Sequence, residues 1–247
     1  SKKYLKRFMA KKVSALSQYL NSSKSLHYSL ILTLPAVAIY EIGILLLFKD
    51  SFFELRNTGE ILLRSFFEYL GLTNPVIIST ILLGFFIIVM VRGYKIEKKP
   101  GIHANYIIYM LLESMLWGSL IFISLQLFTR LPLQIVTMQE KLSNINLAIG
   151  AGIFEELIFR LVLIGSILII LDRGLVLKRG VSVAAAILLS AVVFAGFHLF
   201  MEVYSFPVFS QRVFGGTLLG ILFYARGYGI SVYAHIVYNI LILAYSW

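Results

Sequence analysis

The sequence predicts an all-α fold: a polytopic membrane bundle of about seven or eight spanning helices, with an amphipathic helix at the N-terminus. Of the 247 residues, 59% are hydrophobic and 14% are charged, whereas a soluble domain carries roughly 25% charged residues. Many of the apolar residues gather in runs of about 20, the length that a helix needs to cross a bilayer. These runs leave no room for a separate soluble domain, so residues 1–247 are expected to form a single integral-membrane domain.

The sequence contains no cysteine, which excludes disulfides, thiolate metal sites and a cysteine nucleophile. The net charge of +10 is also typical of nucleic-acid binding. Here, however, the basic residues cluster beside apolar runs, on alternate sides of the expected membrane. We therefore expect membrane lipids as partners and no nucleic acid.

The first 27 residues are basic and look amphipathic. Such a segment is expected to lie as an interfacial helix on an anionic leaflet, with its cations facing the headgroups. The basic residues are Lys2, Lys3, Lys6, Arg7, Lys11 and Lys12, and they interleave with Tyr4, Leu5, Phe8, Met9, Val13 and Leu16.

Seven apolar runs are expected to span the membrane. Between the first two, residues 52–71 have apolar side chains at helical spacing, with Glu60, Arg64 and Glu68 on the opposite face. This pattern predicts either a helix in the membrane interface or a short re-entrant segment, which would be an eighth membrane helix. The seven runs are 28–48, 74–92, 104–129, 144–171, 181–200, 207–225 and 229–247.

Loop charges alternate along the chain. Strongly basic loops follow the second and fourth runs, while the loops after the third and fifth hold few cations. Since positively charged loops remain in the cytoplasm, we expect a multi-pass protein of the plasma or inner membrane with a cytoplasmic N-terminus.

Two adjacent carboxylates and an arginine lie within the fourth run. A charged side chain at the bilayer centre costs ~2.5–3.5 kcal/mol on insertion scales, so three of them in six residues indicate function. Adjacent residues point about 100° apart on a helix, whereas Glu156 and Arg160 lie four apart and can pair. That pairing leaves Glu155 available for a different function. A structural ion cluster joining helices is the alternative.

The fifth and seventh runs carry histidines. Phe194 and His198 lie near the end of the fifth, and His235 and Asn239 lie four residues apart on the seventh. One intramembrane histidine is often only a hydrogen bond between helices, but polar residues on three spans can converge on one cavity. Straight helices with the bounds above would spread these side chains over roughly 10 Å of depth and favour a cavity open toward the outer half.

Such a cavity suits hydrolysis. A carboxylate and a histidine that reach one water can act as its general base, and either can protonate a leaving amine. A histidine N–H and an asparagine amide can stabilise an oxyanion. We expect no cofactor. The alternative is Zn²⁺ held by Glu155, His198 and His235, although the sequence has no H-E-x-x-H motif.

The ordered motifs E-E-x-x-x-R, F-x-x-x-H and H-x-x-x-N on separate apolar runs resemble the CPBP family of intramembrane proteases. That family includes C-a-a-X prenyl endopeptidases and the bacteriocin-processing and self-immunity (Abi) proteins. The resemblance covers about residues 144–247, the motif-bearing part of the chain.

The resemblance implies hydrolysis of a peptide bond in a membrane-associated or lipid- or anchor-tagged protein by a glutamate-type protease, although members have also been labelled metalloproteases. It implies that Glu155 and His198 activate water and that His235 and Asn239 form the oxyanion site. Glu156 and Arg160 would then support the site.

Two other functions fit the same polar cluster. One is a non-catalytic immunity or peptide-binding membrane protein. The other is a transporter or proton relay, in which buried Glu and His are also common; transporters more often show internal repeats and broken helices, which this sequence does not.

Four further polar residues lie within the apolar runs. Glu41 and Glu113 are expected to bond to neighbouring helices, with a place in the same cavity as the alternative. Gln211 and Arg212, near the start of the sixth run, are expected to snorkel to the interface or to face the cavity.

Overall fold

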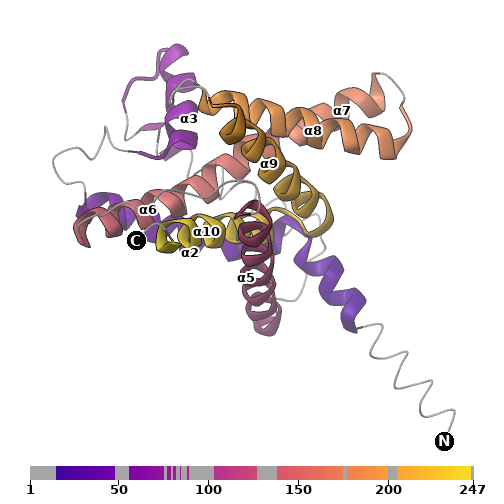
Figure 1. The fold of residues 1–247 in the computed structure, drawn as a ribbon, viewed down its shortest axis with the longest axis horizontal. Coiled ribbons are helices and arrows are strands. Elements are labelled where there is room, and N and C mark those ends of the chain that lie inside the picture. Colours follow the sequence, from indigo (N-terminus) through magenta and orange to yellow (C-terminus); the bar gives the residue numbers. More distant parts are fainter. Residues whose placement is uncertain are drawn as a thin grey trace, which may run out of the picture.

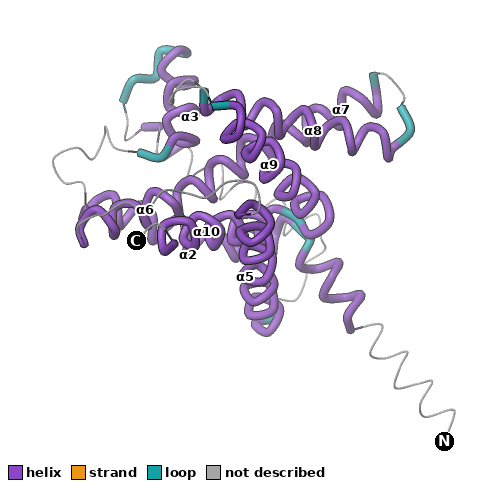
Figure 2. The backbone as a smooth tube through the Cα atoms, viewed as in Figure 1, coloured by secondary structure: helices purple, strands orange, loops and turns teal. Residues whose placement is uncertain are grey.

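The computed structural model describes residues 15–47, 56–74, 103–126, 138–174, 177–199 and 205–245, with a few positions between 77 and 88. Within these ranges the chain forms helices and no strand (Figure 2). The predicted all-α fold is therefore confirmed. Of the N-terminal segment, a helix over 15–23 is described, and the predicted amphipathic pattern of Lys2 to Lys12 lies outside the described residues.

Five described helices are long and apolar enough to cross a membrane, and they coincide with five of the seven predicted runs. Most of the predicted run 74–92 lies outside the described residues. The five helices are α2 (Leu26–Leu47), α5 (Ala104–Gln126), α8 (Arg179–His198), α9 (Phe206–Arg226) and α10 (Tyr228–Tyr245).

The predicted fourth run is helical throughout but changes its winding. An α-helix, α6 (Met138–Glu155), passes into a π-helix, η2 (Glu156–Ile164), and then into α7 (Gly165–Arg173). The change falls between the two adjacent carboxylates. π-helical turns are often found at functional sites.

The amphipathic segment forms α3 (Thr58–Tyr69), whose first turn is capped by Asn57, since its side chain accepts a hydrogen bond from the Glu60 amide. Of the three polar residues that the sequence places on one face of this helix, Glu60 and Arg64 are buried and Glu68 is exposed. Glu60 and Arg64 are buried and form an ion pair, whereas Tyr69 at the end of the helix is 88% exposed. Glu60 and Arg64 face inward, where Glu60 also contacts Arg56 and Tyr40.

Helix α10 is the centre of the bundle and packs against α2, α5, α6 and α9 (Figure 1). One apolar core, which includes Tyr40, Ile153 and Val232, lies between α2, α6 and α10. A second joins α5 to α9 and α10. The Tyr228 hydroxyl donates a hydrogen bond to the Ile153 carbonyl at 2.9 Å and so ties the start of α10 to α6.

Helices α9 and α10 form a tight hairpin. Gly227, between them, has a φ of +88°, a left-handed conformation that glycine adopts without strain. A Cβ at this position would also lie 2.7 Å from the Lys24 carbonyl oxygen. The Ser231 hydroxyl lies 3.4 Å from the Leu219 carbonyl across the hairpin. Away from their junction, α9 and α10 diverge (Figure 1).

The contact between α5 and α10 requires a glycine, and Gly118→Ala tests it. A Cβ at position 118 would lie 2.6 Å from the Ala234 carbonyl oxygen and 2.7 Å from Val237 Cβ. We expect a loss of about 1–3 kcal/mol in stability, because overpacking forces the helices apart. Unfolding of the purified protein in mild detergent measures it.

Gly196→Ala is the matched control, because nothing lies within 4 Å of a Cβ there and position 196 is also helical. It is expected to be neutral or slightly stabilising. Equal unfolding midpoints for the two variants would contradict the close contact.

Candidate active site

A cavity of about 520 Å³ lies between α6, α8, α9 and α10, with the start of α3 at its edge. It brings together the four residues that the motifs predict as catalytic. The residues that line it are Thr58, Ala151, Glu155, Phe194, His198, Val208, Gln211, Arg212, Gly215, Leu219, His235, Tyr238, Asn239 and Ile242.

Glu155 lies between the two histidines. Its Oε1 is 3.8 Å from His198 Nε2, and its Oε2 is 3.8 Å from His235 Nε2. Both distances are too long for a direct hydrogen bond but suit a bridging water. The Glu155 side chain is only 6% exposed, so a water held there would be surrounded by protein.

His198 is oriented by its own helix. Its Nδ1 lies 2.9 Å from the Phe194 carbonyl, one turn earlier in α8. A carbonyl oxygen only accepts, so Nδ1 carries the proton and, in the neutral ring, Nε2 presents a lone pair toward Glu155. The spacing of Phe194 and His198 in the motif thus has a structural role.

Glu156, which does not line the cavity, orients the His235 ring. Its Nδ1 lies 3.0 Å from Glu156 Oε1, and the carboxylate can only accept. The Ser231 hydroxyl donates to the other oxygen of Glu156 at 2.5 Å. Because Ser231 and His235 lie one turn apart on α10, Glu156 fixes one face of that helix. The neutral His235 ring therefore also presents Nε2 to Glu155.

Arg160 completes the support beneath the cavity. Its Nη1 lies 3.2 Å from Glu156 Oε1, which confirms the predicted pair. The guanidinium stacks over the Phe194 ring at 4.7 Å, and its two Nη atoms make no hydrogen bond to the described residues. Charge attraction and the aromatic ring therefore hold Arg160, and neither Glu156 nor Arg160 lines the cavity.

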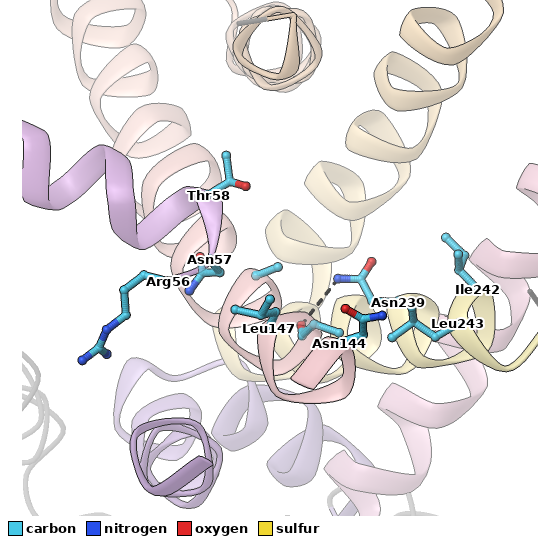
Figure 3. A pocket seen from close by; sticks show the side chains of 10 residues that line it. Arg56, Asn57, Thr58, Asn144, Leu147, Asn239, Ile242 and Leu243 are labelled. Carbon is cyan, nitrogen blue, oxygen red and sulfur yellow. Dashed lines mark hydrogen bonds between the residues drawn. The ribbon is translucent and has the colours of Figure 1, made fainter. Parts of the chain in front are cut away.

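Asn239 lies at the boundary between this cavity and a second one of about 410 Å³, and it lines both. Figure 3 shows its amide turned toward the α6 backbone, where Nδ2 donates to the Ala148 carbonyl at 3.5 Å. Thr58, Ala151 and Ile242 also line both cavities, which makes them neighbouring compartments.

The depths expected from straight helices are wrong. A spread of roughly 10 Å was predicted, yet His198 Nε2 lies 3.8 Å from the Glu155 carboxylate. Glu155 and His198 therefore lie close together, whichever way their helices are inclined.

The other intramembrane carboxylates pair with arginines away from the cavity. Glu113 accepts two hydrogen bonds from Arg226, at 2.6 and 2.9 Å. Glu41 lies 3.0 Å from Arg56. Both therefore join helices to other segments, as predicted, and neither lines the cavity.

The structure adds residues that the motifs do not contain. Ser231 precedes His235 by four residues, as His235 precedes Asn239, so helical spacing is the signal that would have found it. Thr58 and Tyr238 line the cavity without a sequence signal, since their placement depends on packing between segments. Gln211 and Arg212 face the cavity, one of their two predicted places.

The zinc alternative requires Glu155, His198 and His235 to bind one ion. A zinc ion is bound at about 2.0–2.2 Å by nitrogen and oxygen ligands. Among the described residues, no group of three His, Asp or Glu side chains is placed to hold one ion.

Residues 139–241 match the family model described as type II CAAX prenyl endopeptidase Rce1-like. The chain matches no curated protein and no solved structure. The match includes every motif residue from Glu155 to Asn239, and with several membrane-spanning helices it indicates a multi-pass membrane protease of the CAAX type. Over residues 139–241, this chain is therefore similar to the Rce1-like type II CAAX prenyl endopeptidases.

Proposed function

We propose that the protein is a glutamate-type intramembrane endopeptidase that hydrolyses a peptide bond of a membrane-associated or lipid- or anchor-tagged protein. The observation that carries this proposal is the position of Glu155, 3.8 Å from the Nε2 atoms of both His198 and His235 inside one cavity. A carboxylate between two unprotonated nitrogens is suited to take a proton from water.

In the proposed reaction, a water between Glu155 and His198 attacks the scissile carbonyl carbon. Glu155 takes one proton as the C–O bond forms, and the carbonyl oxygen becomes an oxyanion. When the C–N bond breaks, that proton passes to the leaving amine. The products are a carboxylic acid and an amine, and the carboxylate of Glu155 is restored.

To bind an oxyanion, the side chains of His235 and Asn239 must both change from the state seen in the structure. The Nδ1–H of His235 donates a hydrogen bond to Glu156, so Nε2 can donate to an oxyanion only when the ring is doubly protonated. Asn239 donates weakly to Ala148 at 3.5 Å and must turn its amide into the cavity. We infer that, when substrate binds, the Asn239 amide turns into the cavity and the His235 ring takes up its second proton from solvent.

We also propose the cytoplasmic placement of the N-terminus, from the alternation of basic loops. The substrate then reaches the cavity from the membrane, because the cavity lies among helices that span it.

The test is cleavage by purified protein in liposomes, using peptides with and without a prenyl group. We expect cleavage to persist after exhaustive chelation, with no zinc by elemental analysis. Loss of activity on chelation with recovery on adding Zn²⁺ would replace the glutamate mechanism by a metal-dependent one. Binding of peptides without cleavage would support a non-catalytic protein.

A further inference from the structure

The carboxylate that the proposed reaction uses as its base is oriented by packing. Glu155 makes no direct hydrogen bond to the residues that the structure describes, and the Nε2 atoms of His198 and His235 each lie 3.8 Å away. Its neighbour Glu156, by contrast, is bonded to three side chains. A catalytic group must be held within about 0.5 Å of its productive position, so a packing contact has to hold the Glu155 side chain in place.

The first turn of α3 supplies such a contact. Gly59, the second residue of α3, is buried, and a Cβ there would lie 2.9 Å from the Glu155 amide nitrogen and 3.1 Å from Glu155 Cγ. Only glycine, which has no Cβ, allows the two helices to approach so closely at this point. Thr58, which precedes Gly59, lines the same cavity as Glu155. Helix α3 therefore packs directly against the residue that is placed to activate water.

Polar contacts on both sides of Gly59 fix the first turn of α3 in this position. The Tyr40 hydroxyl of α2 accepts hydrogen bonds from the Asn57 backbone amide at 3.2 Å and from Asn57 Nδ2 at 3.0 Å, and it donates to Glu60 at 2.7 Å. A Cβ at Gly150 of α6 would lie 2.5 Å from Asn57 Nδ2. Figure 3 shows Asn57 at the end of α3 that meets α6. The first turn of α3 is thus held between α2 and α6.

We propose that Gly59 is a positioning residue for the general base: through it, the first turn of α3 holds the Glu155 carboxylate between the two histidines. This inference rests on the proposed peptidase function. It extends the site to α3, which lies outside the matched segment 139–241 and outside the motifs. Gly59 acts through Glu155, and a displacement of about 1 Å at a catalytic group can lower a rate about 100-fold. The contact is therefore expected to affect kcat.

The direct test is Gly59→Ala, assayed by peptide cleavage in liposomes. The added methyl group meets the Glu155 backbone, so α3 or Glu155 must move. We expect kcat to fall about 10- to 100-fold and KM to change by less than about 3-fold. Gly180→Ala is the matched control and should cleave at the wild-type rate. Gly180 is the second residue of α8, as Gly59 is of α3, and nothing lies within 4 Å of a Cβ there.

Tyr40→Phe tests the same contact without adding an atom. It removes the hydroxyl that bonds to Asn57 and Glu60, so the first turn of α3 should loosen and kcat should fall about 2- to 10-fold. Tyr28→Phe is its control and should keep the wild-type kcat. Tyr28 also lies on α2, and its hydroxyl accepts a hydrogen bond from the His103 amide, before α5, at 2.9 Å.

A double-mutant cycle separates positioning of the base from a general structural effect. In the Glu155→Gln background, Gly59→Ala should lower the residual rate by less than about 3-fold, because the base is already absent. An equal loss in both backgrounds, a wild-type kcat in Gly59→Ala, or a change confined to KM would overturn the positioning role while the peptidase function stands. If Gly59→Ala does not fold, Tyr40→Phe decides, and a wild-type kcat there overturns the proposal. If the wild-type protein cleaves no peptide, the proposed function itself fails.

Discussion

Replacing Glu155 by glutamine is expected to lower kcat for peptide hydrolysis by about 10²- to 10⁴-fold, the usual contribution of a general base. Glutamine keeps the shape of the side chain but cannot take a proton from water. Glu155 lies 3.8 Å from each histidine and so forms no direct hydrogen bond with either ring. The variant should therefore remain folded, and cleavage assays in liposomes measure the loss.

Glu68→Gln is the control, because Glu68 is an exposed glutamate on α3 outside the cavity. It should cleave at the wild-type rate. His198→Ala should reproduce most of the defect, since the water then loses its second partner. Full activity in both Glu155→Gln and His198→Ala would show that the cavity is not the hydrolytic centre.

Replacing Glu156 by glutamine is expected to destabilise the protein by about 3–5 kcal/mol, because it leaves the buried charge of Arg160 without its counterion. Glu156 is fully buried and contacts Arg160, His235 and Ser231. Activity should fall as well, since His235 loses the carboxylate that orients its ring. Chemical unfolding in mild detergent, followed beside the cleavage assay, separates the two losses.

A second substitution distinguishes the causes. Adding Arg160→Met to Glu156→Gln removes the uncompensated charge and should restore most of the stability, because an apolar replacement of a buried pair is often neutral. Activity should remain low.

Glu113→Gln is the control: the Glu113–Arg226 pair is more exposed, with side chains 19% and 11% accessible, so its loss should cost less. A stable and fully active Glu156→Gln would contradict the supporting role.

Substitutions at the neighbouring residues Glu155 and Glu156 are expected to differ in their effect on folding. Glu155 should be required for activity and dispensable for folding, while Glu156 should be required for both. The division follows from the geometry, because Glu155 lines the cavity and Glu156 lies behind it among Arg160, Ser231 and His235. The change from α6 to η2 falls between them, where the helix widens.

The sequence predicted the helices well because that signal is local. Runs of about 20 apolar residues are sufficient to specify a spanning helix, and five of the described helices lie where such runs occur. The pairing of Glu156 with Arg160 was predictable for the same reason, since residues four apart meet on any helix. The motif order also indicated the family that the match over residues 139–241 confirms.

Features that depend on contacts between distant segments were not predictable. The inward face of α3 follows from Glu60, which is bonded to Tyr40 of α2 at 2.7 Å and to Arg56. The π-helical winding of η2 was not predictable either, because no spacing of apolar residues in the sequence indicates it. The tautomers of His198 and His235 depend on which acceptor each Nδ1 meets.

The sequence by itself therefore determined that this is a membrane helical bundle and named the polar residues at its centre, because hydrophobic length and helical spacing are properties of a single segment. Only the tertiary structure decided that Glu155, His198, His235 and Asn239 share one cavity and that Arg212 faces the same space. The physical reason is that crossing angles and helix winding set the direction and depth of a side chain, and these arise from packing between segments far apart in the chain.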